Sequence, residues 1–549
     1  MTSSNPKVIR IRQKLDRLKS VRQQYESEWS EVRSLIRPYG KDPTASNTPG
    51  DSRVQEVYDS TALQAAVELS AGLHTFVANP IEPWCKFTVA DTTYETSEDE
   101  KRWLQQAADA VHKVYATDKS YFHTAIHEAF RDLPTFGTGY VSQEWSKKDG
   151  CPKFRSHAAA ACWIELNWEG EVSTVYREAE LTLDQIVEQF EKEGGLSEEF
   201  RKDHAAQPYK AVCVIHAVEP RREYDAKKHD ALNMPFSSCW VLPDYDLVLR
   251  ESGYREQVYH PMRWEVLADE IYGRSPAMVV LPDVRVLNAM ERTILRAASK
   301  VVDPPILAED DDVMSELDIS PGAVNFIENI ERRPIPLETG VNIPLGLELS
   351  EQKRNAIRRG LHSDWLQLEK KNIEMTATEV VDRRDEKLRL LAPTLGRLQA
   401  ETLGPLVMRT LNLLIENGRL PAPPGNLGKS VELTVVYTSP AAQAQLRGKS
   451  MILERFVQSV LPIGQLKPEA LDRINFDNLV KIMGDVQDVP RMAMYSDEEL
   501  QRQQEARQAK ENAAIGASTA LDASAALKNI SQARETGMDV TSLLPALGG

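Results

Sequence analysis

Two copies of the tripeptide Gly-Lys-Ser, at residues 428–430 and 448–450, are the first places where the sequence could do chemistry. In a phosphate-binding loop, another glycine stands five positions before this tripeptide, because a glycine-rich backbone must wrap around the phosphates. That position is occupied by Pro423 in one copy and by Gln443 in the other. Neither copy therefore predicts a nucleotide-binding site.

Other catalytic patterns are also incomplete. The segment 137–139, Gly-Thr-Gly, lacks the third glycine of a dinucleotide-binding fingerprint and opens a strand pattern instead of a helix. His362, Ser363 and Asp364 are consecutive in a helical pattern, so their side chains point to different faces and cannot relay a proton. The 82 acidic residues allow so many carboxylate pairs that no single pair is informative. We expect no catalytic residues, no enzymatic activity and no cofactor.

Two groups of residues could be considered as metal ligands. His123 and His127 are four residues apart in a helical pattern, but no third ligand stands at a telling spacing, so a packed or solvated pair is the preferred interpretation. The acidic run 309–312 lacks the alternating acids, the central glycine and the final glutamate of a calcium-binding loop. It predicts a solvated acidic patch, and we expect no metal site.

Composition and charge limit the class of protein. The chain has 549 residues, of which 42% are hydrophobic and 27% charged, as in folded proteins with two to four structural regions. Its formal net charge is −16, whereas proteins that neutralise the phosphates of nucleic acid are usually basic. Either DNA is not a partner, or DNA passes this protein without being held.

The cysteines and the lengths of the apolar segments indicate in which cellular compartment the protein folds. The five cysteines are Cys85, Cys151, Cys162, Cys213 and Cys239. They are odd in number, widely spaced and free of any Cys-x-x-Cys pair, so we expect reduced thiols in a protein that folds in the cytoplasm. The N-terminus has no apolar core of signal-peptide length, and no segment approaches the ~18 apolar residues of a membrane-spanning helix.

The elements that would position any site form an α+β body followed by long helices. Apolar residues at three- and four-residue steps predict helices at 7–37, 59–78 and 98–133. Between about 137 and 265 strand patterns dominate, including a hairpin that turns at Asp149-Gly150, with one helix near 182–193.

Two further helices, predicted at 282–302 and 349–370, flank a polar insertion of about 45 residues. The first begins at Pro282-Asp283. The second carries Ile357, Leu361, Trp365 and Leu368 on one face and Arg354, Arg358 and Arg359 elsewhere. On the residues alone, these arginines mark a solvated or inter-subunit face more often than a phosphate site.

A short polar loop at 371–377 separates the second of these helices from a long one. Thr376 and Glu379 have the spacing of a capping box, and Met375 and Val380 that of a hydrophobic staple, so the helix restarts after the loop. This helix is predicted from 377 to 417, kinked at Pro393 and Pro405 and ended by Asn417-Gly418. A strand near 431–440, helices at 441–460 and 468–484, and an Ala/Gln-rich tail follow.

Three segments, in this order, resemble the portal protein, or head-to-tail connector, of short-tailed double-stranded DNA phages. They are Ala71-Gly72-Leu73 running to Asn79-Pro80 and Pro83-Trp84, then Ile271-Tyr272-Gly273-Arg274-Ser275-Pro276 followed by Leu281-Pro282-Asp283, then Met375-Thr376-Ala377-Thr378-Glu379-Val380 before the long helix. The resemblance spans most of the chain. It implies a helix-rich α+β fold, with an α/β wing, a two-helix stem, a clip, a channel loop, a long kinked helix and a helical crown, assembled as a ring of typically twelve subunits.

On this chain the resemblance implies the following parts. They are N-terminal helices and wing at 1–281, first stem helix at 282–303, clip at 304–348, second stem helix at 349–370, channel loop at 371–377, long kinked helix and returning wing strand at 378–440, crown at 441–496 and a partly helical tail at 497–549. The ring would stand at one capsid vertex of the virion, after synthesis in the host cytoplasm.

The resemblance also implies partners and site residues. Double-stranded DNA would pass through the channel, past Lys370, Lys371, Asn372, Thr376, Thr378, Arg354 and Arg358. The clip would dock first a terminase and later a tail adaptor, through Glu309, Asp310, Asp311, Asp312, Asn325 and Glu328. Capsid and scaffolding proteins would surround the ring. An acidic conduit would repel phosphates and let DNA slide.

Alternatives stay open on the residues alone. Lys370 and Lys371 equally fit the ordinary basic end of a helix. The protein could instead be another large virion protein of the tail or internal core, without a channel. It could also be a soluble enzyme acting on nucleic acid or polysaccharide, which predicts a monomer or small oligomer with a pocket of acidic residues whose pKa values are shifted.

Overall fold

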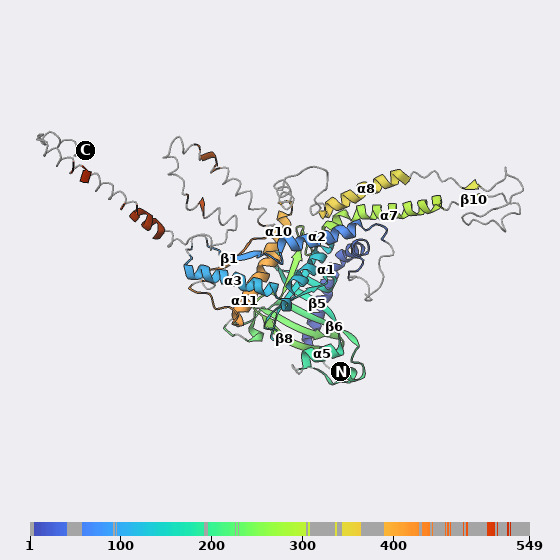
Figure 1. Cartoon of the computed structure of the whole chain (residues 1–549). Helices are drawn as coiled ribbons and strands as arrows, with labels where there is room; N and C mark the ends of the chain where they lie inside the picture. Colours follow the sequence, from blue (N-terminus) through green and yellow to red (C-terminus); the bar gives the residue numbers. More distant parts are fainter. Residues whose placement is uncertain are drawn as a thin grey trace. The chain divides into compact units, whose positions relative to one another are not determined.

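The chain divides into two units, Met1–Gln445 and Leu446–Gly549. Figure 1 labels helices and strands of the first unit. The computed structural model describes residues 5–40, 57–91, 94, 96–191, 196–225, 227–228, 230–302, 306–307, 335–336, 343–363, 389–425, 427, 431–439 and short pieces between 442 and 528. In the second unit the described residues are helical, and their longest run is 502–510. The site discussed below lies in the first unit.

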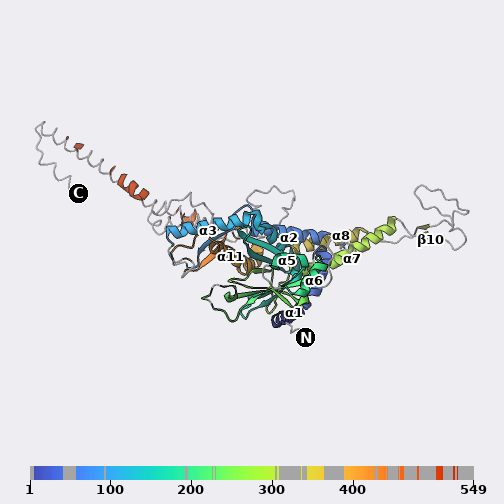
Figure 2. The ribbon, with the colours of Figure 1, turned by 90° about the horizontal axis from the view of Figure 1, so that it is seen from below.

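A five-stranded antiparallel sheet is built as a meander. Its strands are β4 (Cys162–Leu166), β5 (Val172–Thr182), β6 (Ala211–Pro220), β7 (Phe236–Leu242) and β8 (Leu247–Tyr254), paired in that order. Helix α1 (Pro6–Ile36) matches the predicted helix 7–37 and covers one face with Val8, Ile11, Leu15 and Leu18. Helices α5 (Leu183–Phe190) and α6 (Glu198–Ala206) contribute to a separate apolar cluster with the same sheet, and both are labelled beside it in Figure 2.

A second sheet has the order β3-β2-β9 and contains the predicted hairpin. Strand β2 (Thr138–Ser146) pairs with β3 (Cys151–His157) across the Asp149-Gly150 turn and with β9 (Tyr259–Arg263) on its other side. The helical region predicted at 98–133 is divided into two helices. Helix α3 (Glu98–Ala116) and helix α4 (Phe122–Phe136) are separated by the short turn η1 (Asp118–Ser120) and by Tyr121 in a left-handed conformation. This break places the ring centroids of Tyr115 and Phe122 4.0 Å apart, so that both rings belong to one aromatic cluster.

Trp84 is the centre of that aromatic cluster. The residue is 1% exposed and its ring stacks with Tyr115, Phe122 and Tyr437. It follows α2 (Thr61–Val77) and immediately precedes β1 (Cys85–Val89), which pairs antiparallel with β12 (Leu433–Tyr437). The predicted strand near 431–440 therefore pairs with a strand from the N-terminal part of the chain.

Helices α7 (Pro276–Val302) and α8 (Ile343–Gly360) lie side by side in both views (Figures 1 and 2). Both differ from the predicted bounds of 282–302 and 349–370. Helix α7 begins six residues earlier, because Ser275 accepts a hydrogen bond from the Met278 amide and thereby caps it, and Pro282 is tolerated inside. Helix α8 ends at Gly360, and His362 is left-handed, so the continuous helix to 370 was wrong at this point.

The long helix after the loop is described from residue 389 onward. It consists of α10 (Ala392–Leu398), the π-helical turn η8 (Gln399–Leu403) and α11 (Gly404–Glu416), here together called the broken helix. The wide turn stands directly before Pro405, which cannot donate a backbone hydrogen bond into the preceding turn. Asn417 and Gly418 end the helix as predicted, with the Gly418 amide donating to the Ile415 carbonyl over 3.1 Å. No helix among the residues described above is long and apolar enough to cross a membrane.

Candidate functional site: the α7–α8 pair and its supports

The turn before the N-terminal end of α7 is held by a close backbone contact between two glycines. Gly137 has a φ of +73°, and a Cβ atom on it would lie 2.1 Å from the carbonyl oxygen of Gly273. A Cβ atom on Gly273 would lie equally close to the carbonyl oxygen of Gly137. The Gly273 amide also donates to Thr138 Oγ1 over 3.0 Å. The Gly-Thr-Gly segment at 137–139 thus holds the turn before α7. This contact accounts for Gly137 and for Gly273 without a bound nucleotide.

Side chains of the same turn attach it to three other elements. Ser275 Oγ donates to the Thr135 carbonyl over 2.8 Å, at the end of α4. The hydroxyl of Tyr272 accepts from the Ile164 amide on β4, and burial raises the pKa of Tyr272 to about 12. Arg274 forms an ion pair with Glu28 of α1 over 2.8 Å. The direction in which α7 leaves the body is therefore fixed by α4, β4 and α1.

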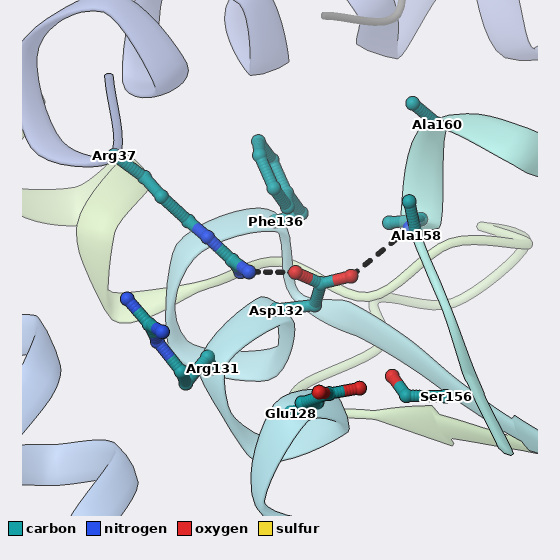
Figure 3. A pocket seen from close by; sticks show the side chains of 9 residues that line it. Arg37, Glu128, Arg131, Asp132, Phe136, Ser156, Ala158 and Ala160 are labelled. Carbon is teal, nitrogen blue, oxygen red and sulfur yellow. Dashed lines mark hydrogen bonds and ion pairs between the residues drawn. The ribbon is translucent and has the colours of Figure 1, made fainter. Parts of the chain in front are cut away.

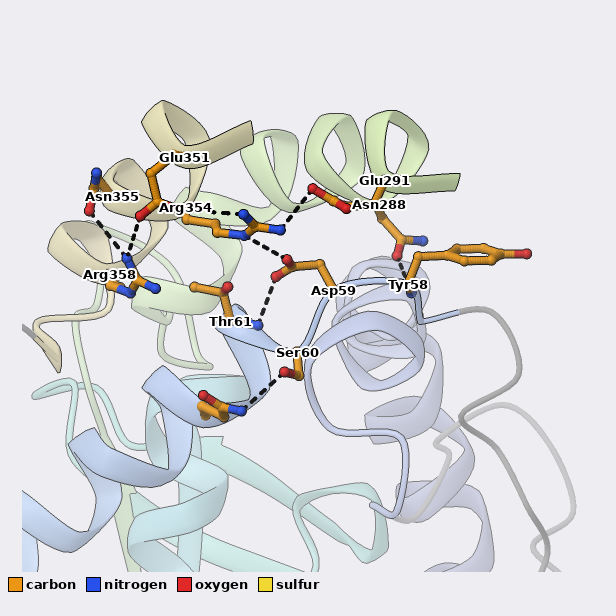
Figure 4. Close-up of polar contacts among 11 residues, drawn as sticks. Tyr58, Asp59, Ser60, Thr61, Asn288, Glu291, Glu351, Arg354, Asn355 and Arg358 are labelled. Atoms are coloured by element: carbon orange, nitrogen blue, oxygen red, sulfur yellow. Dashed lines mark hydrogen bonds and ion pairs between the residues drawn. The ribbon is translucent and has the colours of Figure 1, made fainter. Parts of the chain in front are cut away.

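Arg354 is the polar centre of the α7–α8 pair (Figure 4). Its guanidinium donates to Asp59 over 2.9 Å, to Glu291 of α7 over 2.8 Å and to Glu351 of α8 over 3.3 Å. These contacts join α7, α8 and the segment that leads into α2. Sequence reasoning missed Asp59 and Glu291, because they stand far from Arg354 along the chain; only Glu351, three residues before it, has a helical spacing that could have been noticed.

Two of the acids that bind Arg354, Asp59 and Glu351, have lowered pKa values. Burial opposes ionisation of Asp59, but hydrogen bonds from Thr61 and Arg354 outweigh it and lower the pKa of this carboxyl. Hydrogen bonds from Arg358 and Arg354 lower the pKa of Glu351 in the same way, against a smaller effect of burial. Lys353 adds an ion pair to Asp283 of α7 over 2.7 Å.

The apolar contact between the two helices is tight at their base. Ile357 and Leu361 are fully buried, as their predicted face requires, in one cluster with Val284 and Leu287 of α7. A Cβ atom on Gly360 would lie 2.2 Å from Val280 Cγ1, so the end of α8 lies directly on α7.

The broken helix is held by a different kind of contact. Arg263 of β9 makes a bidentate ion pair with Glu401 in the π-helical turn, over 2.8 and 2.9 Å. Arg409 of α11 is 4% exposed and donates to the backbone carbonyls of Gln143 and Glu256. Burial lowers the pKa of Arg409, although Glu256 opposes this effect. The buried guanidinium thereby ties the broken helix to the second sheet.

The predicted site residues fall into two groups. Arg354 and Arg358 lie in the ion-pair network of α8, where Arg358 binds Glu351 over 3.1 Å. The other channel residues, Lys370, Lys371, Asn372, Thr376 and Thr378, lie outside the described residues. So do Glu309, Asp310, Asp311, Asp312, Asn325 and Glu328, although β10 (Ile306–Leu307) and β11 (Ile335–Pro336), which flank them, pair antiparallel.

The two histidines considered as metal ligands pack against a third. His74 Nε2 lies 3.3 Å from His123 Nδ1, and the His74 and His127 rings are 5.4 Å apart. Burial is the largest influence on His74 and, with the neighbouring histidines, lowers its pKa to about 4. Among the residues whose positions are described, no three His, Cys, Asp or Glu side chains are arranged to hold a metal ion.

A cavity of about 300 Å³, here called the α4 pocket, opens beside α4 (Figure 3). It is lined by Arg37, Glu128, Arg131, Asp132, Phe136, Ser156, Ala158, Ala159 and Ala160. Asp132 pairs with Arg37 and accepts from the Ala159 amide over 3.0 Å, while burial raises the pKa of Asp132. Sequence reasoning missed this pocket, because three separate segments build it.

The similarity to known proteins extends over both the α7–α8 pair and the broken helix. Residues 9–494 match the protein family described as bacteriophage head to tail connecting protein. The chain is 30% identical over 478 residues to the probable portal protein of Bordetella phage BPP-1, covering 85% of each chain. It is 27% identical over 516 residues to the portal protein of Salmonella phage epsilon15, covering 91% of each chain. The chain therefore belongs to the family of bacteriophage head-to-tail connecting proteins.

Proposed function

We propose that this protein is the portal of a bacteriophage, a structural ring at one capsid vertex through which the genome enters during packaging and leaves during ejection. The observation that carries the proposal is the similarity to two phage portal proteins over 85% and 91% of the chain. This similarity favours a portal over the tail or core protein and over the soluble enzyme considered above.

In this proposal the α7–α8 pair is the stem of the portal. The two sheets with α1 to α6 form the wing. The clip, predicted at 304–348, lies between the stem helices and ends where α8 begins at Ile343. The clip docks a separate ATP-hydrolysing terminase and later a tail adaptor, through its acidic residues at 309–312. Residues 441–496 form the crown, and twelve subunits surround the DNA, with capsid and scaffolding proteins outside them.

The proposed channel residues divide by their contacts. Arg354 and Arg358 already bind acidic partners, so their part is to fix the stem that borders the DNA path. Lys370, Lys371, Asn372, Thr376 and Thr378 form the channel loop and its exit, and meet the DNA. A chain with a net charge of −16 repels phosphates elsewhere, so that DNA is not trapped.

The class of protein is tested by light scattering and negative-stain electron microscopy of the purified chain. We expect rings of roughly a dozen subunits with a central hole wide enough for a DNA duplex. A monodisperse monomer that forms no rings even at high concentration would refute the proposal.

The channel loop is tested separately with Lys371→Glu. This change places a negative charge beside the DNA path, so we expect normal ring assembly but altered packaging or retention of DNA. The measurement is the amount of DNA per capsid, compared with Lys210→Glu on the surface of the wing as the control. Equal DNA filling in both variants and the parent would remove the loop from the mechanism.

A further inference from the structure

Trp168 is an aromatic side chain displayed on a fixed turn. It is 91% exposed, whereas Trp29, Trp84 and Trp163 are at most 4% exposed. The turn between β4 and β5 is shaped by Asn167, whose Oδ1 accepts the amides of Glu169 and Glu171 over 2.9 Å each. An indole held on a rigid turn loses little conformational entropy on binding, which is the property of an anchor residue at a protein interface.

The α4 pocket has the complementary character. Phe136 and the alanines 158–160 give it a small-residue, apolar wall, and its 300 Å³ volume is that of a small ligand pocket. Arg131, whose side chain is exposed, also lines it, as does the half-buried Arg37, which points toward Asp132 (Figure 3). Glu128, also exposed, supplies a carboxylate that can accept the indole N–H.

The charged side chains allow one ion pair between the two features, although the α4 pocket is lined by two arginines and by the two carboxylates of Glu128 and Asp132. Glu169 and Glu171 stand on either side of Gly170, next to Trp168, and both are exposed. Arg131 of the pocket is therefore the matching cation for one of these carboxylates. Asp132 does not oppose this pairing, because Arg37 and the Ala159 amide already hold its carboxylate.

The anchor and the pocket lie at opposite ends of one strand. Ala158–Ala160 precede Cys162, the first residue of β4, and Trp168 follows Leu166, its last residue. A five-residue strand spans roughly 17 Å, so a chain cannot place its own Trp168 in its own pocket. Two different patches that bind each other between identical chains make a head-to-tail contact, which closes into a ring when the rotation fits.

We infer that Trp168 of one subunit inserts into the α4 pocket of the next subunit, with Glu169 or Glu171 paired to Arg131. The partner is thus a second copy of this chain, and the contact repeats around the assembly. This inference rests on the proposed function, because it assigns one of the contacts that close the portal ring.

The test uses two variants that each damage one side of the contact. Trp168→Ala removes the anchor, and Ala158→Trp fills the pocket; Tyr209→Ala, which removes another aromatic side chain of 83% exposure, is the matched control. Sedimentation velocity over a concentration series should show rings of the parent and the control. Each of the two variants should need at least about tenfold more protein to form rings, as expected for loss of an interface anchor.

Mixing the variants separates this contact from a folding defect. Trp168→Ala keeps a working pocket and Ala158→Trp keeps a working anchor, so an equimolar mixture should form heterodimers at a concentration where each variant alone is monomeric. Rings of either single variant at parental concentrations would overturn the inference, and so would a mixture without heterodimers. If the parent itself forms no rings, the proposed function fails instead.

A charge exchange gives an independent measurement. Arg131→Glu should weaken ring formation, and the added substitutions Glu169→Lys and Glu171→Lys should restore it, because the pair is then reversed. Failure of this rescue, with all variants folded by circular dichroism, would rule out the proposed ion pair and with it the insertion geometry.

Discussion

The α7–α8 pair and the broken helix are both long helical regions, yet they are held in different ways. Around Arg354, the side chains of Asp59 and Glu291 are 10% and 12% exposed, whereas Glu351 is 52% exposed. The broken helix depends on Arg409, which is almost fully buried, and on a row of buried leucines. The outer ion pairs of the α7–α8 pair, Arg358–Glu351 and Lys353–Asp283, are exposed and can break and re-form at little cost, whereas a buried charge such as Arg409 cannot lose its partners. The first region can therefore adjust while the second holds the body rigid.

The largest expected effect comes from the buried side of this comparison. Arg409→Ala should lower the free energy of unfolding by about 3–5 kcal/mol, because it leaves buried carbonyl groups and the partly buried Glu256 without their partner. The measurement is urea unfolding followed by circular dichroism, and Glu256→Gln is the control, with a smaller loss. A change below about 0.5 kcal/mol, the level of an ordinary surface substitution, would show that the broken helix is not held this way.

Acid should weaken the body before it weakens the helix pair. Burial lowers the pKa of His260 in β9 to about 3, so its contribution to stability is present above the unfolded value of 6.5 and is lost as the pH falls below that value. At pH 5 this loss amounts to about 2 kcal/mol. Asp59 and Glu351, with pKa values below their usual 3.8 and 4.5, lose their contribution only at still lower pH.

This order can be measured by hydrogen exchange with mass spectrometry, corrected for the intrinsic pH dependence of exchange. Peptides of β9 should lose protection between pH 6.5 and 5, and peptides of α8 only below about pH 4.5. His260→Gln should flatten the first of these transitions. Simultaneous loss of protection in both regions would contradict the division drawn here.

The smallest expected effect concerns the helix pair itself. Arg358→Ala should destabilise α8 by at most about 1 kcal/mol at low salt, because its ion pair with Glu351 is exposed and contributes little once solvent screens it. The effect should shrink in 1 M NaCl, whereas the effect of Arg409→Ala should not. The measurement is exchange protection of α8 in both salt conditions, and a salt-independent loss would mean that Arg358 acts through packing.

Much of the fold followed from local patterns. The apolar periodicity of α1, the Asp149-Gly150 turn and the prolines of the broken helix each specify their structure within a few residues. The errors arose where distant contacts decide. Tyr121 breaks a helix so that Phe122 can reach Trp84, and α7 starts at Pro276 because Ser275 caps it on a turn locked against Gly137.

The candidate site was less predictable for the same reason. Arg354 was singled out from its charge, but its partners Asp59 and Glu291 come from other segments, and no spacing joins them. Trp168 carried no signal either, because only its exposure in the folded chain distinguishes it from the buried tryptophans.

The pairing of β1 with β12 has a consequence for synthesis. Thr438 Oγ1 donates to the Pro83 carbonyl, 355 residues earlier in the chain, next to the stacked rings of Trp84 and Tyr437. At translation rates of about 5–20 residues per second, the first strand waits roughly 20–70 s on the ribosome for its partner. A prematurely terminated chain can never close this sheet. A chain that ends before β12 would thus leave β1 unpaired and Trp84 without the ring of Tyr437, which would expose this part of the core to proteases.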